Sequence, residues 1–343
     1  MKVGILGATG SVGQRFIQVL ESHPRFEVVQ LFGEKSAGHS YDTIRWILHG
    51  DVPGYVRNKR VEYISSISPE IDIVFSALPA TAAETEEIKL AEEGFMVASN
   101  ASAHRMDDDV PILIPEVNPD HLSLLNHQQK ERGWRGMLVT NPNCVTAVLC
   151  LALKPLLDAF GLSQVTVVTM QAISGAGYPG LPSLDILGNV IPYIHGEEEK
   201  IIEETRKILG TCSGNRISPL PLNMVVSCNR VPTVDGHIMN VFVETDGTCT
   251  ADEVIDVFNN FSALPQLKKL PTAPEKPIIV VESEDRPQTR LDLHPMAITV
   301  GRIRKCENIL AFTVLGHNTV RGAAGGSVLN AELMEVMNWM EKQ

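Results

Sequence analysis

A glycine-rich turn between a short apolar strand and a helix constrains the fold of this chain more than any other feature. Gly7, Gly10 and Gly13 are spaced GxxGxxG, directly after the apolar run 2–6 and at the start of a helical pattern. Small residues there let the backbone approach a pyrophosphate, and the free N–H groups of the first helical turn favour its negative charge. A lone glycine pattern is weak evidence, but its place between strand and helix favours a dinucleotide site over a merely tight turn.

The first third of the chain alternates between strand and helix patterns. Short apolar runs predict strands over 2–6, 27–32, 71–78 and 95–99, and helical spacing predicts helices over 11–21 and 82–93. Strands that alternate with helices imply a parallel, doubly wound sheet of the Rossmann type.

The rest of the chain is different. A long apolar helix is predicted over 144–160, and the later patterns predict an α+β domain with a mixed, largely antiparallel sheet and helices on one face. Its predicted strands are 164–173, 224–231, 237–245, 297–304 and 309–315, and its helices are 197–209 and 251–261. A last helix over 319–340 is expected to pack back on the first sheet. We therefore predict one domain from 1–141 and 318–343, and a second from 142–317.

Composition excludes several classes of partner. The net charge of -12 argues against nucleic acid and anionic membranes, because both attract an excess of Lys and Arg. A local cluster of cations can still bind an anionic substrate. The chain shows no secretory signal and no apolar run long enough to span a bilayer. Its six cysteines form no CxxC pair and its histidines no zinc pattern, so we expect no metal, reduced thiols and a cytoplasmic protein.

The end of the second predicted strand indicates the cofactor. An acidic residue there would bind the ribose 2′-hydroxyl of NAD. Gly33 occupies that place instead, and Lys35 and Ser36 follow it as candidate partners for a 2′-phosphate. The pattern favours NADP, although Glu34 leaves NAD open. The predicted nucleotide site comprises Gly7, Thr9, Gly10, Ser11, Val12, Gly13, Lys35, Ser36 and Leu78.

Cys144 is the candidate nucleophile. It follows Asn141-Pro142-Asn143, between a strand and the long apolar helix. A thiol at a helix N-terminus gains from the dipole and the free amides, which lower its pKa, and the same amides can hold an oxyanion. Asn143 adds a side-chain donor or a helix cap. Cys150, Cys228 and Cys306 suit small buried residues instead.

A thiol nucleophile needs a general acid or base beside it. His237 is the candidate among ten histidines, because the segment 230–237 places Arg230 and His237 on a predicted strand–turn–strand hairpin through Asp235-Gly236. Both side chains would then face one site.

Together these segments resemble aspartate-semialdehyde dehydrogenases, in the archaeal and fungal branch of that family. The resemblance covers essentially the whole chain and keeps the family's order and spacing. Its segments are GATGSVG from Gly7, SNASAHRMDDDVPILIPEVN from Ser99, NPNC, QAISGAGYPG from Gln171, GEEEK from Gly196, NRVPTVDGH and HNTVRGAAGG from His317.

The resemblance implies a role for each matching residue. Cys144 would be the nucleophile, His237 the acid/base, and Gln171 a residue that orients substrate and nucleophile. Arg230 would hold the substrate carboxylate, for which a planar guanidinium is suited. Glu197 would receive the substrate ammonium, although Glu197 and Lys200, three residues apart on one helical face, would otherwise be a solvated ion pair. The phosphate would be held by Lys200 and Arg105, and the nicotinamide side by Ser174, Gly175 and Asn318.

The implied reaction is the NADPH-dependent reductive dephosphorylation of L-aspartyl 4-phosphate to L-aspartate 4-semialdehyde through a Cys144 thioester. Two alternatives remain open. A malonyl-CoA reductase shares the cysteine and SGAGYPG, but the Asn before the cysteine and the segment GEEEK suit an amino-acid substrate with a phosphate leaving group. A cofactor-sensing regulator without catalysis would have no need of Cys144, Gln171, Glu197, Arg230 and His237. The family also implies a homodimer or homotetramer.

Overall fold

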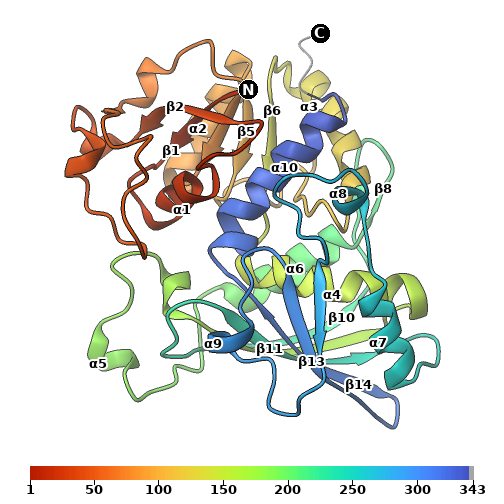
Figure 1. Cartoon of the computed structure of the whole chain (residues 1–343). Helices are drawn as coiled ribbons and strands as arrows, with labels where there is room; N and C mark the ends of the chain where they lie inside the picture. The colour runs from red at the N-terminus through yellow and green to blue at the C-terminus, as the bar shows by residue number, and fades with distance from the viewer. Residues whose placement is uncertain (340–343) are drawn as a thin grey trace.

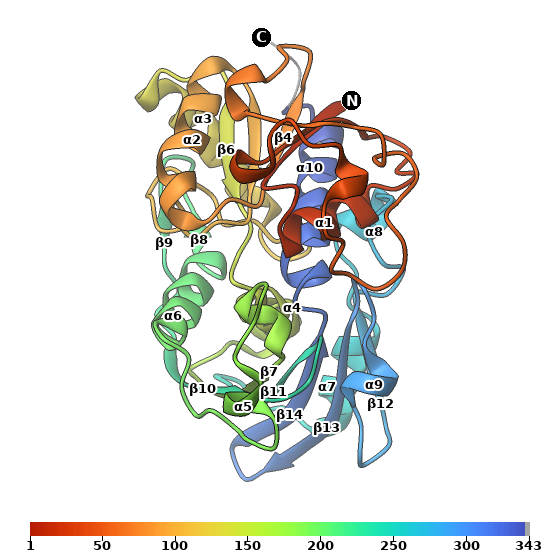
Figure 2. The same cartoon turned by 90° about the vertical axis from the view of Figure 1, so that its left-hand side faces the viewer.

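A computed structural model describes residues 1–339, which form two bodies, each built around its own β-sheet (Figures 1 and 2). The N-terminal sheet and its helices lie at one end, and the second sheet lies at the other. Helix α4 (Cys144–Phe160) lies on the second sheet, on its side toward the first body, and α10 (Gly325–Val336) runs alongside the first sheet. None of the helices in residues 1–339 is long and apolar enough to cross a membrane.

The first sheet is parallel throughout, as predicted. Its six strands are ordered β3-β2-β1-β4-β5-β6. Their bounds are β1 Lys2–Leu6, β2 Glu27–Phe32, β3 Val61–Glu62, β4 Ile73–Ser76, β5 Met96–Ser99 and β6 Met137–Thr140. The strand predicted over 71–78 is shorter than expected, because the chain turns after Ser76 to begin α2 at Ala80 rather than at 82. The Rossmann-type prediction is confirmed.

Three helices accompany this sheet. These are α1 Ser11–Val19, α2 Ala80–Glu93 and α3 Leu124–Arg132. Helix α1 is anchored by Phe16, whose ring stacks on Phe75 of β4 at 5.0 Å between centroids. Helix α2 ends at Gly94, which adopts the left-handed conformation that glycine favours (φ 107°). Helix α3 was not anticipated, because most of its residues are polar.

The second sheet is mixed. Its strands are ordered β10-β7-β11-β14-β13-β12. The three inner pairings are antiparallel and the two outer ones, β10 with β7 and β12 with β13, are parallel. Their bounds are β7 Gln164–Gln171, β10 Asn223–Arg230, β11 His237–Glu244, β12 Ile278–Val281, β13 Ile298–Cys306 and β14 Ile309–Gly316. The prediction of a largely antiparallel sheet is confirmed, although β12 was not foreseen.

The predicted hairpin between Arg230 and His237 is wrong. Strand β7 lies between β10 and β11, pairing parallel with the first and antiparallel with the second. The segment 231–236 therefore crosses over the end of β7 instead of forming a tight turn. The sequence of two strands with a short loop containing Asp235-Gly236 suggested a hairpin, but β7 inserts between them from 52 residues earlier in the chain.

Helices cover one face of the second sheet. They are α4 Cys144–Phe160, α6 Glu197–Ile208 and α7 Ala251–Asn259. Burial alternates along β7 and β11, with the Val165, Val167 and Val241 side chains fully buried among residues of α4. The other face is half-buried along these two strands and exposed at Val225 of β10. The remaining short elements are α5 Ser183–Ile186, α8 Leu264–Leu267, α9 Thr289–Asp292, β8 Thr211–Cys212 and β9 Ile217–Ser218.

The C-terminal helix packs on the first body, as predicted. Residues 320–336 are not one regular helix, because Ala323 has non-helical φ and ψ between η6 Val320–Ala324 and α10 Gly325–Val336. Helix α10 shares a core with residues of β1 and α1. The predicted end at Met340 lies outside the described residues. The division into 1–141 with 318–343 and 142–317 stays a prediction, for which this packing is support.

Candidate active site

The nucleotide turn joins β1 to α1 in a conformation that needs glycine. Gly7 has φ +67°, and a Cβ there would lie 2.6 Å from the carbonyl oxygen of Ala77. A Cβ at Gly13 would lie 2.1 Å from the carbonyl oxygen of Gly7. Helix α1 begins at Ser11, so the N–H groups of Ser11, Val12 and Gly13 stand at its first turn, where a helix has no internal acceptor.

The end of β2 lies beside this turn. A Cβ at Gly33 would lie 3.6 Å from the hydroxyl oxygen of Thr9, so the two segments are adjacent. Lys35 is exposed in the short helix η1 Glu34–Ser36, and Ser36 is partly exposed beside it. Leu78 lies two residues after β4, and its backbone nitrogen would be 3.5 Å from a Cβ at Gly7. The residues predicted for the nucleotide thus gather at the carboxyl edge of the first sheet, where such sheets bind ligands.

Three predicted site residues lie together at one end of the second sheet. Arg230 ends β10, Gln171 ends β7 and His237 begins β11. Arg230 is paired with Gln171, and the next pair along, Met170 with Ile238, puts His237 beside them. All three side chains are buried. The sheet, rather than a hairpin, brings Arg230 and His237 to one site.

The thiol and the imidazole are in contact. Cys144 Sγ lies 3.2 Å from His237 Nε2, and the N–H of Ala172 donates to His237 Nδ1 at 3.0 Å. Because Nδ1 accepts this hydrogen bond, the neutral ring carries its proton on Nε2, which faces the sulfur. The Ala172 carbonyl in turn accepts a hydrogen bond from Arg230 Nη1 at 2.8 Å. One residue's backbone therefore links the histidine to the arginine.

The electrostatics of Cys144 and His237 correct one prediction. Burial raises the pKa of the Cys144 thiol to about 12, and the Glu197 carboxylate adds to the rise, whereas Arg230 and Arg105 oppose it. Burial also lowers the pKa of His237 to about 3, with Arg230 acting in the same direction. The expected low thiol pKa is not found, because desolvation outweighs the helix N-terminus. The residue as a whole is only partly buried.

Asn143 is both a helix cap and a donor. Its Oδ1 accepts from the N–H of Val145 at 2.8 Å and of Thr146 at 3.4 Å, which caps α4 directly before the nucleophile. Its Nδ2 donates to Glu197 Oε1 at 2.8 Å. The nucleophile's helix and the predicted ammonium-binding carboxylate are therefore held by one side chain.

The two predicted phosphate-binding residues are placed differently. Arg105 is buried and donates to Glu204 Oε1 (2.9 Å) and to the carbonyls of Asn141 and Asn100. The Lys200 side chain is exposed on the first turn of α6 and makes no hydrogen bond or ion pair within residues 1–339. The structure brings Arg105 to the Cys144 turn, whereas the Lys200 side chain is exposed on α6.

The loop after β7 covers the site. A Cβ at Gly175 would lie 2.7 Å from Arg230 Nη1 and 3.1 Å from the His237 ring, so this glycine allows close packing over both. Asn318 Nδ2 donates to Ser174 Oγ at 2.7 Å, and its Oδ1 accepts from the N–H of Gly236. Asn318 therefore holds two loops together, whereas its predicted contact with the nicotinamide stays a prediction. The Gln171 amide is directed to Thr169 and Cys228.

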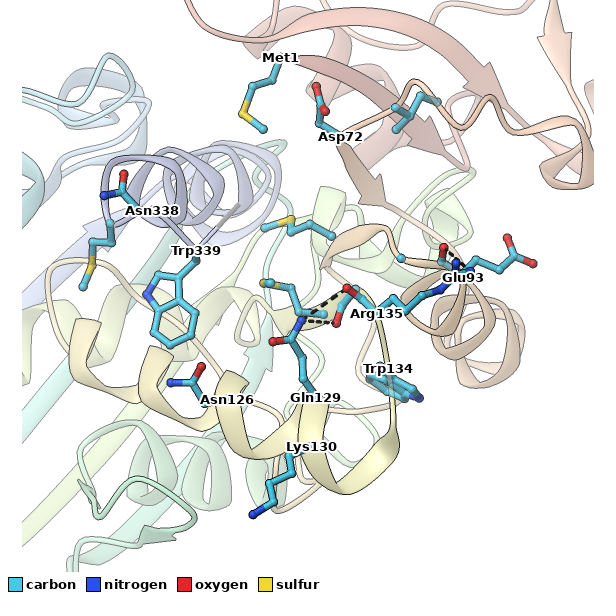
Figure 3. Close-up of a pocket in the computed structure, with 16 residues that line it drawn as sticks. Met1, Asp72, Glu93, Asn126, Gln129, Lys130, Trp134, Arg135, Asn338 and Trp339 are labelled. Atoms are coloured by element: carbon cyan, nitrogen blue, oxygen red, sulfur yellow. Dashed lines mark hydrogen bonds between the residues drawn. The ribbon is translucent and has the colours of Figure 1, made fainter. Parts of the chain in front are cut away.

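A large pocket lies away from this site. It has a volume of about 910 Å³ and lies at the amino edge of the first sheet, where Met1, Asp72 and Met137 line it (Figure 3). The candidate site lies at the carboxyl edge of the same strands.

Three residues of the site were not identified from sequence. Glu204 and Lys207 lie on α6 beneath Glu197, and Gly322 packs so closely that a Cβ there would lie 2.7 Å from Cys144 Cβ. The available signal was spacing, since Glu204 is seven residues, about two helical turns, after Glu197 and therefore on the same face.

Comparisons with known proteins agree with this geometry. Residues 2–125 match the model of the semialdehyde dehydrogenase NAD-binding domain, and residues 153–321 match that of the semialdehyde dehydrogenase dimerisation domain. An aspartate-semialdehyde dehydrogenase of Archaeoglobus fulgidus is 53% identical over 338 residues, 97% of each chain. The crystal structure of the Candida albicans enzyme with NADP superposes with a TM-score of 0.91 at 36% identity, over 98% of this chain and 99% of that one.

The rival family is also represented among the relatives. A malonyl-CoA reductase (NADP) of Metallosphaera sedula is 39% identical and covers 100% of this chain and 99% of its own. Its identity is clearly lower than the 53% of the Archaeoglobus protein. With the thiol, its histidine and the glycine turn in place, the chain belongs to the aspartate-semialdehyde dehydrogenase family.

Proposed function

We propose that this chain reduces L-aspartyl 4-phosphate to L-aspartate 4-semialdehyde with NADPH, through a thioester on Cys144. The observation that carries the proposal is the 3.2 Å contact between Cys144 Sγ and His237 Nε2, at the same sheet end as Arg230 and Gln171. The 53% identity over nearly the whole length to an aspartate-semialdehyde dehydrogenase supports the substrate.

The nucleotide turn fits NADP. Gly7 and Gly13 leave no room for a Cβ, which is the close backbone approach that a pyrophosphate needs. Gly33 has no carboxylate that could bind the ribose 2′-hydroxyl of NAD. The exposed Lys35 side chain is our candidate partner for the 2′-phosphate of NADP. When bound, NADPH supplies the hydride. We expect higher kcat/KM with NADPH than with NADH, and a smaller ratio in Lys35→Ala.

The Cys144 thiol gives its proton to a phosphoryl oxygen of the substrate, because Nε2 of the neutral His237 ring already carries a proton. The sulfur then attacks the acyl carbon while His237 Nε2–H donates to it, and the bond between the acyl carbon and the phosphate oxygen breaks. Phosphate leaves and the thioester forms. The N–H of Cys144, at the start of α4, holds the oxyanion. His237 can accept a proton at Nδ1 only if the hydrogen bond from Ala172 N–H is released. Proton transfer by this ring therefore requires a small shift of the 172–175 loop.

The substrate's charges have separate partners in this proposal. Arg230 binds the α-carboxylate, and the Glu197 carboxylate receives the ammonium group. Glu197 is the second cause of the high thiol pKa. A substrate ammonium group on Glu197 neutralises that charge and lowers the thiol pKa as substrate binds. Lys200 and Arg105 hold the phosphate, and Gln171 orients the acyl group.

The half-buried face of the second sheet is our proposed contact between copies of the chain, as a homodimer or a pair of dimers. It carries Val225, 59% exposed, on its edge strand, and it belongs to the region that matches a dimerisation domain. Val225→Glu is expected to weaken association in sedimentation experiments.

The six free thiols support a cytoplasmic location.

One assay separates the candidate functions. Oxidation of aspartate semialdehyde is followed by NADPH formation, with and without phosphate, and reduction is tested with malonyl-CoA. The proposal requires phosphate-dependent turnover. Reduction of malonyl-CoA without phosphate dependence would make the chain a malonyl-CoA reductase. If the protein bound NADP but turned over neither aspartate semialdehyde nor malonyl-CoA, it would be a cofactor-sensing regulator.

A further inference from the structure

Glu204 joins two parts of the site that are distant in sequence. Its Oε1 accepts a hydrogen bond from Arg105 Nη1 at 2.9 Å, and its Oε2 accepts one from the main-chain N–H of Asn143 at 2.6 Å. The side chain is buried, with 2% of its surface exposed. A single carboxylate thus touches both the predicted phosphate-binding arginine and the residue that precedes the nucleophile.

Only a carboxylate satisfies both donors. Glutamine has one acceptor oxygen, and its NH₂ group would face a second N–H donor. Replacing Glu204 by glutamine therefore keeps the shape and must break one of the two hydrogen bonds. Aspartate keeps both oxygens but is one methylene shorter.

Arg105 is oriented on three sides. Besides Glu204, it donates from Nε to the Asn141 carbonyl at 2.8 Å and from Nη2 to the Asn100 carbonyl at 2.9 Å. Three of the five N–H donors of the guanidinium are therefore used within the described chain, which leaves two for an anion. Among residues 1–339, Glu204 is the charged partner of Arg105, so it contributes most to fixing the guanidinium plane.

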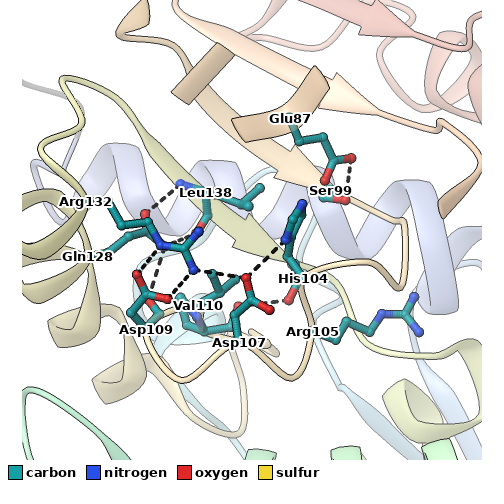
Figure 4. A network of polar contacts seen from close by, with 12 residues as sticks. Glu87, Ser99, His104, Arg105, Asp107, Asp109, Val110, Gln128, Arg132 and Leu138 are labelled. Atoms are coloured by element: carbon teal, nitrogen blue, oxygen red, sulfur yellow. Dashed lines mark hydrogen bonds and ion pairs between the residues drawn. The ribbon is translucent and has the colours of Figure 1, made fainter. Parts of the chain in front are cut away.

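The backbone around Arg105 is held independently of Glu204. Lys207 Nζ donates to the carbonyls of Arg105, Asp107 and Val110 at 2.7–2.9 Å. On the other side, Arg132 binds the Asp107 and Asp109 carboxylates (Figure 4). The Arg105 side chain points away from that network. A change at Glu204 should therefore release the arginine side chain without unfolding its loop.

Helix α6 contacts Asn143 at two places. The Asn143 side chain reaches Glu197, and the Asn143 N–H reaches Glu204 two turns later. We propose that Glu204 is a positioning residue, which holds Arg105 and the Cys144 turn in one fixed relation for the phosphate step. The inference rests on the proposed function, because it takes phosphate as the leaving group.

The test is Glu204→Gln, with Glu203→Gln as its matched control, since Glu203 is exposed on the same helix. We expect the apparent KM for phosphate to rise about tenfold in Glu204→Gln, as for the loss of one charged hydrogen bond. The KM for aspartate semialdehyde should change less than about twofold. The control should keep both values. An unchanged phosphate KM in folded Glu204→Gln overturns the proposal.

A second measurement needs no substrate. The rate of Cys144 alkylation by iodoacetamide is followed against pH. Glu204→Gln leaves the Arg105 charge without its counterion, so the midpoint should move to lower pH, whereas a purely structural role would leave it in place. If the wild-type enzyme shows no phosphate dependence, the proposed function fails, and the alkylation midpoint alone decides the inference. Should Glu204→Gln not fold, Glu204→Asp keeps the charge but is one methylene shorter, so it should raise the phosphate KM and leave the alkylation midpoint near its wild-type value. A wild-type phosphate KM in Glu204→Asp would overturn the proposal.

Discussion

The nucleotide turn and the covalent centre are built in opposite ways. The turn is one continuous segment, residues 7–13, whose conformation follows from its own glycines and the strand before it. The covalent centre combines the start of α4, the ends of β7 and β10, the start of β11 and one face of α6. A local motif is therefore sensitive to the space at a single Cα, whereas an assembled site is sensitive to charged partners far apart in sequence.

The largest effect should come from the centre of the assembled site. Cys144→Ser is expected to lower kcat by on the order of 10³-fold or more, because a hydroxyl is a much weaker nucleophile than a thiolate. NADP binding should not change, since the nucleotide turn is a separate segment. Turnover and fluorescence titration with NADPH measure the two. Near-normal turnover in the serine variant would remove Cys144 from the mechanism.

Substitutions of the charged residues in the assembled site should each affect the binding of a different substrate group. Arg230→Leu should impair use of aspartate semialdehyde by on the order of 1.5–3 kcal/mol in kcat/KM, because it loses a charged hydrogen bond in every step. Lys200→Ala should chiefly raise the apparent KM for phosphate, and Glu197→Gln should weaken selection of the amino group alone. Steady-state kinetics with each substrate varied decide this. Phosphate saturation left untouched by Lys200→Ala, together with turnover of a CoA thioester, would contradict the division.

The local motif provides a matched pair of variants. Gly13→Ala brings a Cβ within 2.1 Å of the Gly7 carbonyl oxygen, whereas the nearest atom to a Cβ at Gly10 is 3.5 Å away. Gly13→Ala should therefore weaken NADP binding by about tenfold or more and lower the free energy of unfolding by on the order of 1–3 kcal/mol. Gly10→Ala should keep the stability. Equal stability of the two variants would show that the turn adapts more easily than its geometry suggests.

Lowering the pH should reduce the stability of the folded protein by a smaller amount. Burial lowers the pKa of His317 to about 4. His317 precedes Asn318, which is hydrogen-bonded to Ser174 and Gly236. The unfolded chain then binds a proton near pH 6.5 that the folded chain takes up only near pH 4, so stability is lost as the pH falls between these values. The loss should reach on the order of 2 kcal/mol at pH 5. His317→Asn should flatten the pH dependence of Tm in this range; an unchanged slope would assign the effect to other groups.

Local sequence patterns predicted much of the fold and of the Cys144 turn. The parallel sheet, the mixed sheet, the cap at Asn143 and the start of α4 at Cys144 all followed from strand and helix periodicity and from residue types that act on their neighbours. The predicted catalytic residues were gathered from separate motifs, and the structure places Cys144, His237 and Arg230 together.

The predictions that were wrong or missing concern contacts between segments that are distant in the sequence. The hairpin between Arg230 and His237 was wrong because β7, far earlier in the chain, inserts between their strands. The lowered thiol pKa was wrong because burial at Cys144 comes from elements that the NPNC segment does not contain. Glu204 was not identified because its two partners lie 99 and 61 residues away.

The sequence by itself determined the nucleotide turn, the nucleophile's place at a helix start and the fold class, since each depends on interactions within a few residues or on repeating periodicity. Only the tertiary structure decided the order of the strands in the second sheet, the tautomer of His237 and the partners of Arg105. These depend on hydrogen bonds and desolvation between segments tens of residues apart, and strand order in particular is set by which apolar faces can be buried together.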